Sequence, residues 1–256
     1  MAYRSTRQLV NDLGRHQRLI IVDDPVDPHL ELAEIHRRVY RQQGPALLFN
    51  NVIGTRFPVA SNLFGTLERA RFIFRDTLGG VKQAVRWKAN PAAALRNPLK
   101  LFGAPRIAWR MQPKRVSRAV VMEHTCRLSE LPQIVCWPDD GGPFVTLPQV
   151  LSQLSKESLS HINLGMYRVQ LAGNQYQRDA EIGLHYQIHR SIGVHHAAAK
   201  RAGQPFRVNV LVGGPPSLAV AAVMPLPEGM SELGFAGALG RRRVRMIRRP
   251  GALPIH

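Results

Sequence analysis

Hydrophobic positions in the first third of the chain follow two spacings in turn, which predicts alternating helices and strands. Apolar residues three and four positions apart indicate helices, and short apolar runs between turn residues indicate strands. The predicted helices cover residues 5–14, 28–43 and 66–77, with Ser5 or Thr6 as the first N-cap, and the predicted strands cover 18–22, 46–49 and 57–60. Such alternation is typical of an α/β module.

Residues 79–113 are basic, with helical patches and breaks at Pro91, Pro98 and Pro105, and we interpret them as a connection. From residue 116 onward the pattern changes to short strands joined by polar turns. The predicted strands cover residues 119–122, 144–150, 163–171, 183–188 and 207–212, and the predicted helices cover 194–202 and 218–223, with Ser217 as the cap of the last. The fold class is therefore α+β, with an N-terminal α/β domain and connection at residues 1–115 and a second domain at 116–256.

Composition excludes several classes of protein. The chain has no run of about 18 apolar residues, so no membrane-spanning helix is expected, and its first residues do not resemble a signal peptide. Cys126 and Cys136 lack a CxxC spacing, which favours two reduced thiols in a cytosolic protein.

The formal net charge of +18 indicates anionic partners, such as nucleic acid, an anionic membrane surface or a phosphorylated ligand. Basic residues are spread from Arg4 to Arg249 and do not form one stripe with interleaved aromatic residues. We therefore expect no specific nucleic-acid partner, and a basic nucleic-acid-binding protein is the least favoured alternative. The expected location is the cytoplasm. Peripheral attachment to the inner face of the membrane is a further option within this expectation.

The segment from Asn163 to Gln170 carries the most informative chemistry. Asn163 and Arg168 are five residues apart, so in a regular strand they lie on opposite faces, unless Gly165 resets the alternation. An amide oxygen suits a hard cation, and a guanidinium suits an anion. An ordinary strand with a hydrogen-bonded asparagine is the alternative.

Two later segments join this one. His185 and His189 are four residues apart and Arg190 follows, and Glu232 comes after a Pro/Gly turn at the start of an apolar helix. These motifs, in this order, resemble the UbiD family of decarboxylases, which use prenylated FMN. The resemblance extends to further segments along nearly the whole chain, at residues 26–34, 44–49, 62–65 and 131–144.

The resemblance implies a fold and a set of site residues. The second domain is expected to be an incomplete split β-barrel of the flavin-reductase type. Asn163, His189 and Glu232 are the expected ligands of one divalent cation, Mn²⁺ or Mg²⁺, with K⁺ nearby. His185 competes with His189 as the ligand, and Glu232 has an alternative role at a helix N-terminus. The expected cofactor-binding residues are Met166, Tyr167, Arg168, His185, Tyr186, Gln187, Arg190 and Ser191. Arg168 is also the expected catalytic residue: its guanidinium is expected to face the cavity of the metal ligands, to hold the substrate carboxylate and to make no surface ion pair.

The resemblance also implies an activity, the non-oxidative decarboxylation of an aromatic or α,β-unsaturated acid. The 4-hydroxy-3-polyprenylbenzoate step of ubiquinone synthesis is one such reaction, and a flavin prenyltransferase supplies the cofactor. Family members continue beyond the position of His256 with a proton-donating acid, which Asp139, Asp140 and Glu181 do not replace. We therefore expect a truncated carboxy-lyase that forms a homo-oligomer or pairs with a complementary chain. The alternative is a catalytically incomplete subunit that binds flavin and metal.

Overall fold

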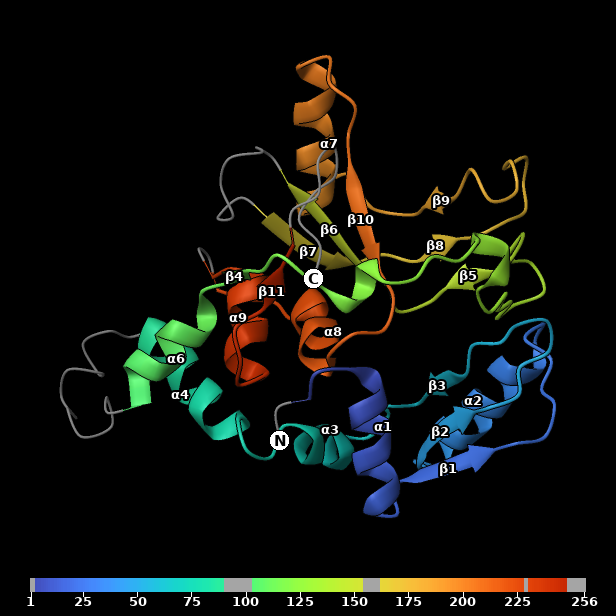
Figure 1. Cartoon of the computed structure of the whole chain (residues 1–256), viewed down its shortest axis with the longest axis horizontal. Helices are drawn as coiled ribbons and strands as arrows, with labels where there is room; N and C mark the ends of the chain where they lie inside the picture. The colour runs from blue at the N-terminus through green and yellow to red at the C-terminus, as the bar shows by residue number, and fades with distance from the viewer. Residues whose placement is uncertain (1–2, 90–102, 154–161, 228–229, 248–256) are drawn as a thin grey trace.

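The computed structural model describes residues 3–89, 103–153, 162–227 and 230–247. The N-terminal part follows the predicted alternation of helices and strands (Figure 1). Its elements are α1 (Thr6–Arg15), β1 (Leu19–Val22), α2 (Glu31–Arg41), β2 (Ala46–Phe49), β3 (Val59–Ser61), α3 (Leu67–Ile73) and α4 (Leu78–Ala89). Ser5 is the N-cap of α1 and accepts a hydrogen bond from the Gln8 amide. Helix α2 begins three residues later than predicted because Leu30 has a positive φ of 69°.

The first three strands form a small sheet with α2 as the connection between its parallel pair. β1 pairs with β2 in parallel, and β3 pairs with β2 in the antiparallel direction. The buried side chains under this sheet are Val26, Leu32, Leu47, Phe49 and Val52. Burial of these apolar side chains stabilises the βαβ unit.

The second half contains three further small sheets and four of the helices (Figure 1). Its elements are α6 (Ala104–Met111), β4 (Lys114–Arg115), η2 (Val120–Met122), η3 (Leu128–Glu130), β5 (Phe144–Val145), β6 (Gln149–Gln153), β7 (Ile162–Met166), β8 (Val169–Gln170), β9 (Gly183–Leu184), α7 (Ser191–Arg201), β10 (Val208–Leu211), α8 (Pro216–Val223), α9 (Glu232–Leu239) and β11 (Arg245–Met246). The sheets have the orders β10-β6-β7, β5-β8-β9 and β11-β4.

Several predicted strands are wrong in extent or in type. The predicted strand 119–122 contains the 3₁₀ turn η2, and the predicted strands 144–150 and 163–171 each divide into two strands of different sheets. The predicted strand 183–188 retains two residues in β9. Ser217 does not cap α8, because the helix begins at Pro216 with Pro215 as its N-cap. Pro105 does not break α6 but lies in its first turn, where the missing N–H costs nothing.

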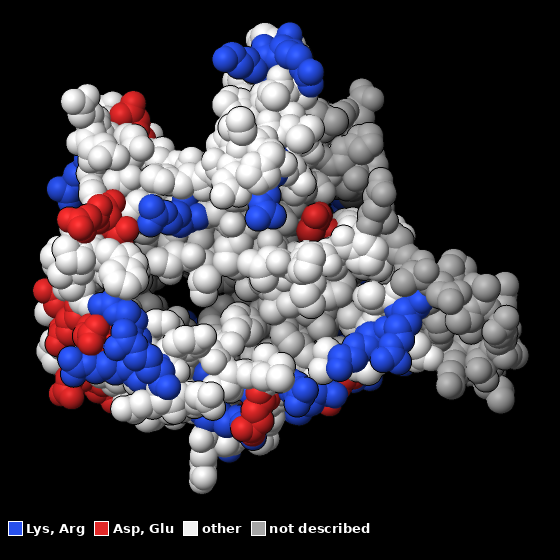
Figure 2. Space-filling model, turned by 180° about the vertical axis from the view of Figure 1, so that it is seen from behind, with Lys and Arg blue, Asp and Glu red and all other residues white. Residues whose placement is uncertain are grey.

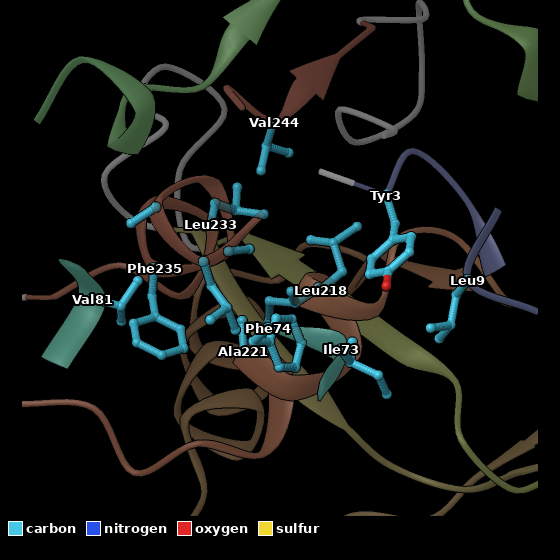
Figure 3. Close-up of a cluster of buried hydrophobic side chains, with 14 of the residues drawn as sticks. Tyr3, Leu9, Ile73, Phe74, Val81, Leu218, Ala221, Leu233, Phe235 and Val244 are labelled. Carbon is cyan, nitrogen blue, oxygen red and sulfur yellow. The ribbon is translucent and has the colours of Figure 1, made fainter. Parts of the chain in front are cut away.

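One hydrophobic cluster joins the two halves of the chain. Leu9 and Leu13 of α1 and Ile73 of α3 belong to the same buried cluster as Leu218 of α8 and Leu233 of α9. Figure 3 shows these helices contributing side chains to one continuous core. The core therefore crosses the predicted boundary at residue 115.

Helices α8 and α9 lie between the N-terminal helices and the β10-β6-β7 sheet, and α7 projects beyond the other side of that sheet (Figure 1). No helix in the described ranges is long and apolar enough to cross a membrane. Cys126 and Cys136 are both free thiols, as predicted.

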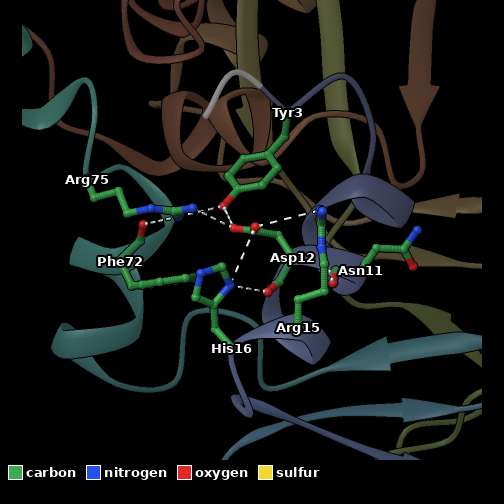
Figure 4. A network of polar contacts seen from close by, with 7 residues as sticks. All are labelled: Tyr3, Asn11, Asp12, Arg15, His16, Phe72 and Arg75. Carbon is green, nitrogen blue, oxygen red and sulfur yellow. Dashed lines mark hydrogen bonds and ion pairs between the residues drawn. The ribbon is translucent and has the colours of Figure 1, made fainter.

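A buried carboxylate links α1 to the end of α3 (Figure 4). The Tyr3 hydroxyl donates to Asp12 Oδ2 at 2.6 Å, and Arg75 Nη2 lies 2.9 Å from the same oxygen. Burial acts to raise the pKa of the Asp12 carboxyl, but the hydrogen bonds from Tyr3 and Arg75 outweigh it and hold the pKa below its usual value. Burial, together with the bond to Asp12, raises the pKa of Tyr3 to about 12.

We expect Asp12→Asn to lower the free energy of unfolding by about 1.5–3 kcal/mol, the usual contribution of hydrogen bonds to charged groups. Because the folded-state pKa of Asp12 is lowered, its contribution is present above the unfolded pKa of about 4 and is lost as the pH falls through the folded pKa. Urea denaturation from pH 7 down to pH 3 measures both effects. Asp24→Asn, at an exposed position, is the matched control, and equal stability of the two variants at pH 7 would contradict the prediction.

Candidate functional site

Strand β7 lies at one edge of the β10-β6-β7 sheet and carries the first predicted ligand. Asn163 is buried, and it pairs across the sheet with Ser152 of β6. Its Nδ2 atom lies 3.5 Å from Ser152 Oγ, which in turn lies 3.0 Å from His195 Nδ1 of α7. Asn163 is therefore part of a network of polar contacts that extends from β7 through Ser152 to His195 of α7.

Tyr167 folds back over the same strand and brings its hydroxyl to Asn163. A Cβ at Gly165 would lie 2.4 Å from the Tyr167 ring and 2.5 Å from its hydroxyl, so only glycine leaves room for this ring. Burial raises the pKa of Tyr167, while hydrogen bonds from the Asn163 side chain and the Ile192 amide act to lower it. Gly165 thus makes room for a tyrosine and is not the reset of strand alternation that the sequence suggested.

Glu232 joins this group from the N-terminus of α9. Its carboxylate accepts hydrogen bonds from its own amide and from the Leu164 amide of β7, and its charge contributes to the pKa of Tyr167. Burial raises the pKa of Glu232, and these two hydrogen bonds oppose the shift. Ser231 caps α9 and accepts from the Gly234 amide. Residues from β7 and α9, far apart in the sequence, therefore meet at one place.

The N-terminus of α7 lies against the same group. Arg190 is the N-cap and Ser191 the first helical residue, and the Ile192 amide reaches the Tyr167 hydroxyl. A Cβ at Gly193 would lie 2.1 Å from the Ile188 carbonyl oxygen, so glycine is required for this tight entry into the helix. Free amides at a helix N-terminus favour anions.

The two segments predicted to contact the cofactor lie side by side. The pairing of β8 with β9 continues beyond the strands, because the His185 amide donates to the Arg168 carbonyl at 3.3 Å. The rings of Tyr167 and Tyr186 are in edge contact, with centroids 6.4 Å apart. Residues 166–168 and 185–187 therefore form adjacent stretches of one surface, with Met166 half-buried at the end of β7 and Gln187 exposed.

Arg168 has a different environment from Asn163. Its Nη1 atom lies 3.2 Å from Asp140 Oδ1, and its guanidinium carbon lies 4.4 Å from the centre of the Phe144 ring. The His185 ring packs edge-on against the same phenylalanine. The expectation that Arg168 makes no surface ion pair is therefore wrong. One face of the guanidinium is held by Phe144 and one nitrogen by Asp140, which fixes its plane.

His189 is exposed, in the turn before α7. Among the described residues, no hydrogen bond, ion pair or ring contact links it to Asn163, Tyr167 or Glu232. No group of three or more His, Cys, Asp or Glu side chains is placed to hold a metal ion in the described ranges. Of the three metal ligands predicted from the sequence, only His189 and Glu232 are of these types, since the third is Asn163. The convergence of the three side chains on one cation stays a prediction.

Sequence reasoning did not identify Ser152, His195 or His196. His196 Nδ1 contacts the Tyr186 hydroxyl, and its ring stacks on Phe206 at 5.0 Å. The sequence does show that His195 and His196 lie next to each other in a predicted helix. This position alone does not indicate which strand either histidine faces.

We expect Gly165→Ala to lower the free energy of unfolding by about 1–3 kcal/mol, the usual cost of overpacking, because the added methyl collides with the Tyr167 ring. Tyr167→Ala in the same chain should recover most of this loss, since it removes the colliding atoms. Thermal denaturation of the two single variants and the double variant measures the coupling. Additive losses would show that Tyr167 does not lie over Gly165.

The surface beside α7 is concave. Figure 2 shows the molecule hollowed between α7 and the arm that carries β5, β8 and β9, with basic and acidic side chains on the face below the hollow. Residues 185–190 connect β9 to α7 and so run between the two sides of this hollow (Figure 1).

Comparison with known proteins places the chain in a family. Residues 10–88 match the 3-octaprenyl-4-hydroxybenzoate carboxy-lyase N-terminal domain, and residues 110–255 match the Rift-related domain of the same carboxy-lyase. An uncharacterized protein of Chlamydia trachomatis is 38% identical over 248 residues, which cover 95% of this chain and 42% of that protein. A 4-hydroxybenzoate decarboxylase subunit of Chlamydia pneumoniae is 39% identical over 242 residues, covering 90% of this chain and 39% of that protein.

Solved structures show the same fold. The closed form of vanillic acid decarboxylase from Sedimentibacter hydroxybenzoicus has a TM-score of 0.79 at 19% identity, covering 98% of this chain and 52% of that chain. The UbiD-class enzyme HmfF from Pelotomaculum thermopropionicum, in complex with prenylated FMN, has a TM-score of 0.74 at 20% identity, covering 98% and 54%. The chain thus spans about half the length of these proteins, and with its mixed helix and sheet fold it belongs to the UbiD family of decarboxylases.

Proposed function

We propose that the chain supplies the cofactor-binding part of a prenylated-FMN-dependent carboxy-lyase that acts on an aromatic or α,β-unsaturated carboxylic acid. One observation carries the proposal: Asn163, Tyr167 and Glu232 meet at the N-termini of α7 and α9, beside the surface formed by residues 166–168 and 185–187. The prenylated FMN bound by HmfF supports the choice of cofactor.

The residues present fit a divalent cation and a phosphate. The amide oxygen of Asn163 and the half-buried carboxylate of Glu232 are hard oxygen ligands that suit Mn²⁺ or Mg²⁺, and Mn²⁺ also accepts the imidazole of His189. The positive end of the α7 dipole, together with Arg190 and Ser191, would favour the flavin phosphate nearby. In this proposal K⁺ lies close to the divalent cation and takes backbone oxygens.

The residues that would hold the flavin ring system are Met166, Tyr167, His185, Tyr186 and Gln187. When bound, prenylated FMN supplies the electron sink for loss of CO₂. The substrate carboxylate binds the N–H groups of Arg168 that do not contact Asp140. Phe144 and Asp140 hold the guanidinium plane and thereby orient the carboxylate before it leaves.

A second candidate is favoured by a specific observation, the naming of the Chlamydia pneumoniae relative as one subunit of a decarboxylase. In this alternative the chain binds flavin and metal but turns over only with a complementary chain or in an oligomer.

We further propose that the sheets β10-β6-β7 and β5-β8-β9 form the incomplete split barrel expected for residues 116–256, after an N-terminal domain at 1–115. The protein acts in the cytoplasm, at the inner face of the membrane when its substrate is polyprenylated. Nothing in the contacts of the described basic residues favours a nucleic-acid partner over this assignment.

Co-expression with a flavin prenyltransferase, followed by a CO₂-release assay, tests the proposed function. The substrate panel contains 4-hydroxy-3-polyprenylbenzoate, simple hydroxybenzoates and cinnamic-type acids. Release by the chain alone supports the first candidate. Release only after addition of a chain that covers the remaining length of the relatives supports the second. No release in either case, from protein that carries the cofactor, would contradict the decarboxylase assignment.

A further inference from the structure

Three polar side chains follow one another from the proposed metal site into α7. Asn163 and Ser152 are direct cross-strand partners on β7 and β6. Ser152 is fully buried, and its hydroxyl lies 3.5 Å from Asn163 Nδ2 and 3.0 Å from His195 Nδ1. A buried hydroxyl needs hydrogen-bond partners, and Ser152 has one on each side, in β7 and in α7.

The three groups can form a directed chain of hydrogen bonds. Asn163 Nδ2 can only donate, so Ser152 Oγ accepts from it. The hydroxyl hydrogen of Ser152 is then available to His195 Nδ1, which accepts it in the tautomer that carries its proton on Nε2. The Asn163 side chain also hydrogen-bonds to Tyr167. With Nδ2 directed to Ser152, the Oδ1 end of the amide faces away from the Ser152 hydroxyl and remains for a cation.

This direction matters because the two ends of an amide have nearly the same shape and opposite chemistry. A flipped Asn163 would present an NH₂ group to the metal and could not bind it. Residues that hydrogen-bond a metal ligand on the side away from the metal commonly fix its orientation in this way.

We propose that Ser152 and His195 are positioning residues that hold the Asn163 amide in the orientation in which Oδ1 faces the divalent cation. This inference rests on the proposed function, since it assumes that Asn163 is a ligand.

The test measures Mn²⁺ affinity by electron paramagnetic resonance, on the full chain with FMN present. Ser152→Ala should weaken Mn²⁺ binding about 10–100-fold, the usual effect of losing a partner behind a ligand. His195→Ala should do the same, and His195→Gln should restore part of the loss, because its side-chain oxygen accepts from Ser152. Since both act through one amide, the Ser152→Ala/His195→Ala double variant should be no weaker than the poorer single variant.

Two comparisons separate positioning from a general effect on the fold. Ser217→Ala removes a hydroxyl that is also buried but lies against Gly240 at the other end of α9, so its Mn²⁺ affinity should equal that of the wild type. In the Asn163→Asp background, where both side-chain oxygens accept, Ser152→Ala should cause little further change. A role limited to folding would give the same loss in both backgrounds.

The outcomes distinguish this inference from the function on which it rests. If the wild type binds Mn²⁺ with FMN but Ser152→Ala binds equally well, the positioning role is overturned and the proposed function stands. If the wild type binds no Mn²⁺ in the presence of FMN, both are overturned.

Discussion

Glu232→Gln should weaken Mn²⁺ binding more than about 100-fold. Loss of a residue that only hydrogen-bonds a metal ligand typically lowers metal affinity about 10–100-fold, and loss of a charged ligand lowers it further. The substitution keeps the size of the side chain and an oxygen that accepts from the Leu164 amide. The start of α9 and its contact with β7 should therefore remain intact, which circular dichroism can verify. A loss of Mn²⁺ affinity in a correctly folded variant is therefore due to the missing charge of Glu232 and not to its role in the fold.

Titration of Mn²⁺ into the chain with FMN measures this prediction. Glu123→Gln, at an exposed position away from the site, is the matched control and should bind as the wild type does. Equal affinity of Glu232→Gln and the control would remove Glu232 from the metal site. It would leave Glu232 with the alternative role of a helix N-terminal carboxylate.

Arg168→Lys should lower kcat/KM for decarboxylation about 100-fold, in the form of the protein that turns over. An ammonium can still pair with Asp140, but it cannot also offer the flat donor fork that a carboxylate requires. It also loses the stacking on Phe144 that fixes the plane of the guanidinium. Misplacement of a substrate by about 1 Å costs a rate factor of this size.

Steady-state kinetics with the best acid of the panel measures the loss. Arg178→Lys is the control, because this exposed arginine also lies beside an aspartate, Asp179, but outside the proposed site. A larger KM with unchanged kcat would assign Arg168 to binding alone. Near-normal values of both constants would show that another group holds the carboxylate.

The sequence predicted most of the N-terminal elements because their signals are local. Ser5 before an amphipathic run and Gly44-Pro45 after one specify where helices begin and end. The strands of the second half were less predictable. Residues 163–171 read as one strand, but whether the chain stays in one sheet at Tyr167 depends on the partners β6 and β9, which come from distant segments.

The candidate site was likewise only partly predictable from the sequence. Asn163 and Glu232 were identified from motifs, and both interact with Tyr167. Their joint role as metal ligands stays a prediction. The pairing of Arg168 with Asp140 could not be predicted, because it depends on how residues 137–142 turn before β5. Ser152 could not be identified from the sequence, because the predicted strand ended at residue 150 and a single serine gives no sign of its cross-strand neighbour.

The location of the cation tests the proposed site most directly. Crystals of the chain grown with FMN and Mn²⁺, measured at the manganese absorption edge, would show the metal by its anomalous scattering. We expect one strong peak at about 2 Å from Asn163 Oδ1 and the Glu232 carboxylate, the distance typical of hard divalent cations, with the flavin phosphate as a further ligand. A bound flavin whose phosphate and manganese lie away from Asn163 and Glu232 would contradict it.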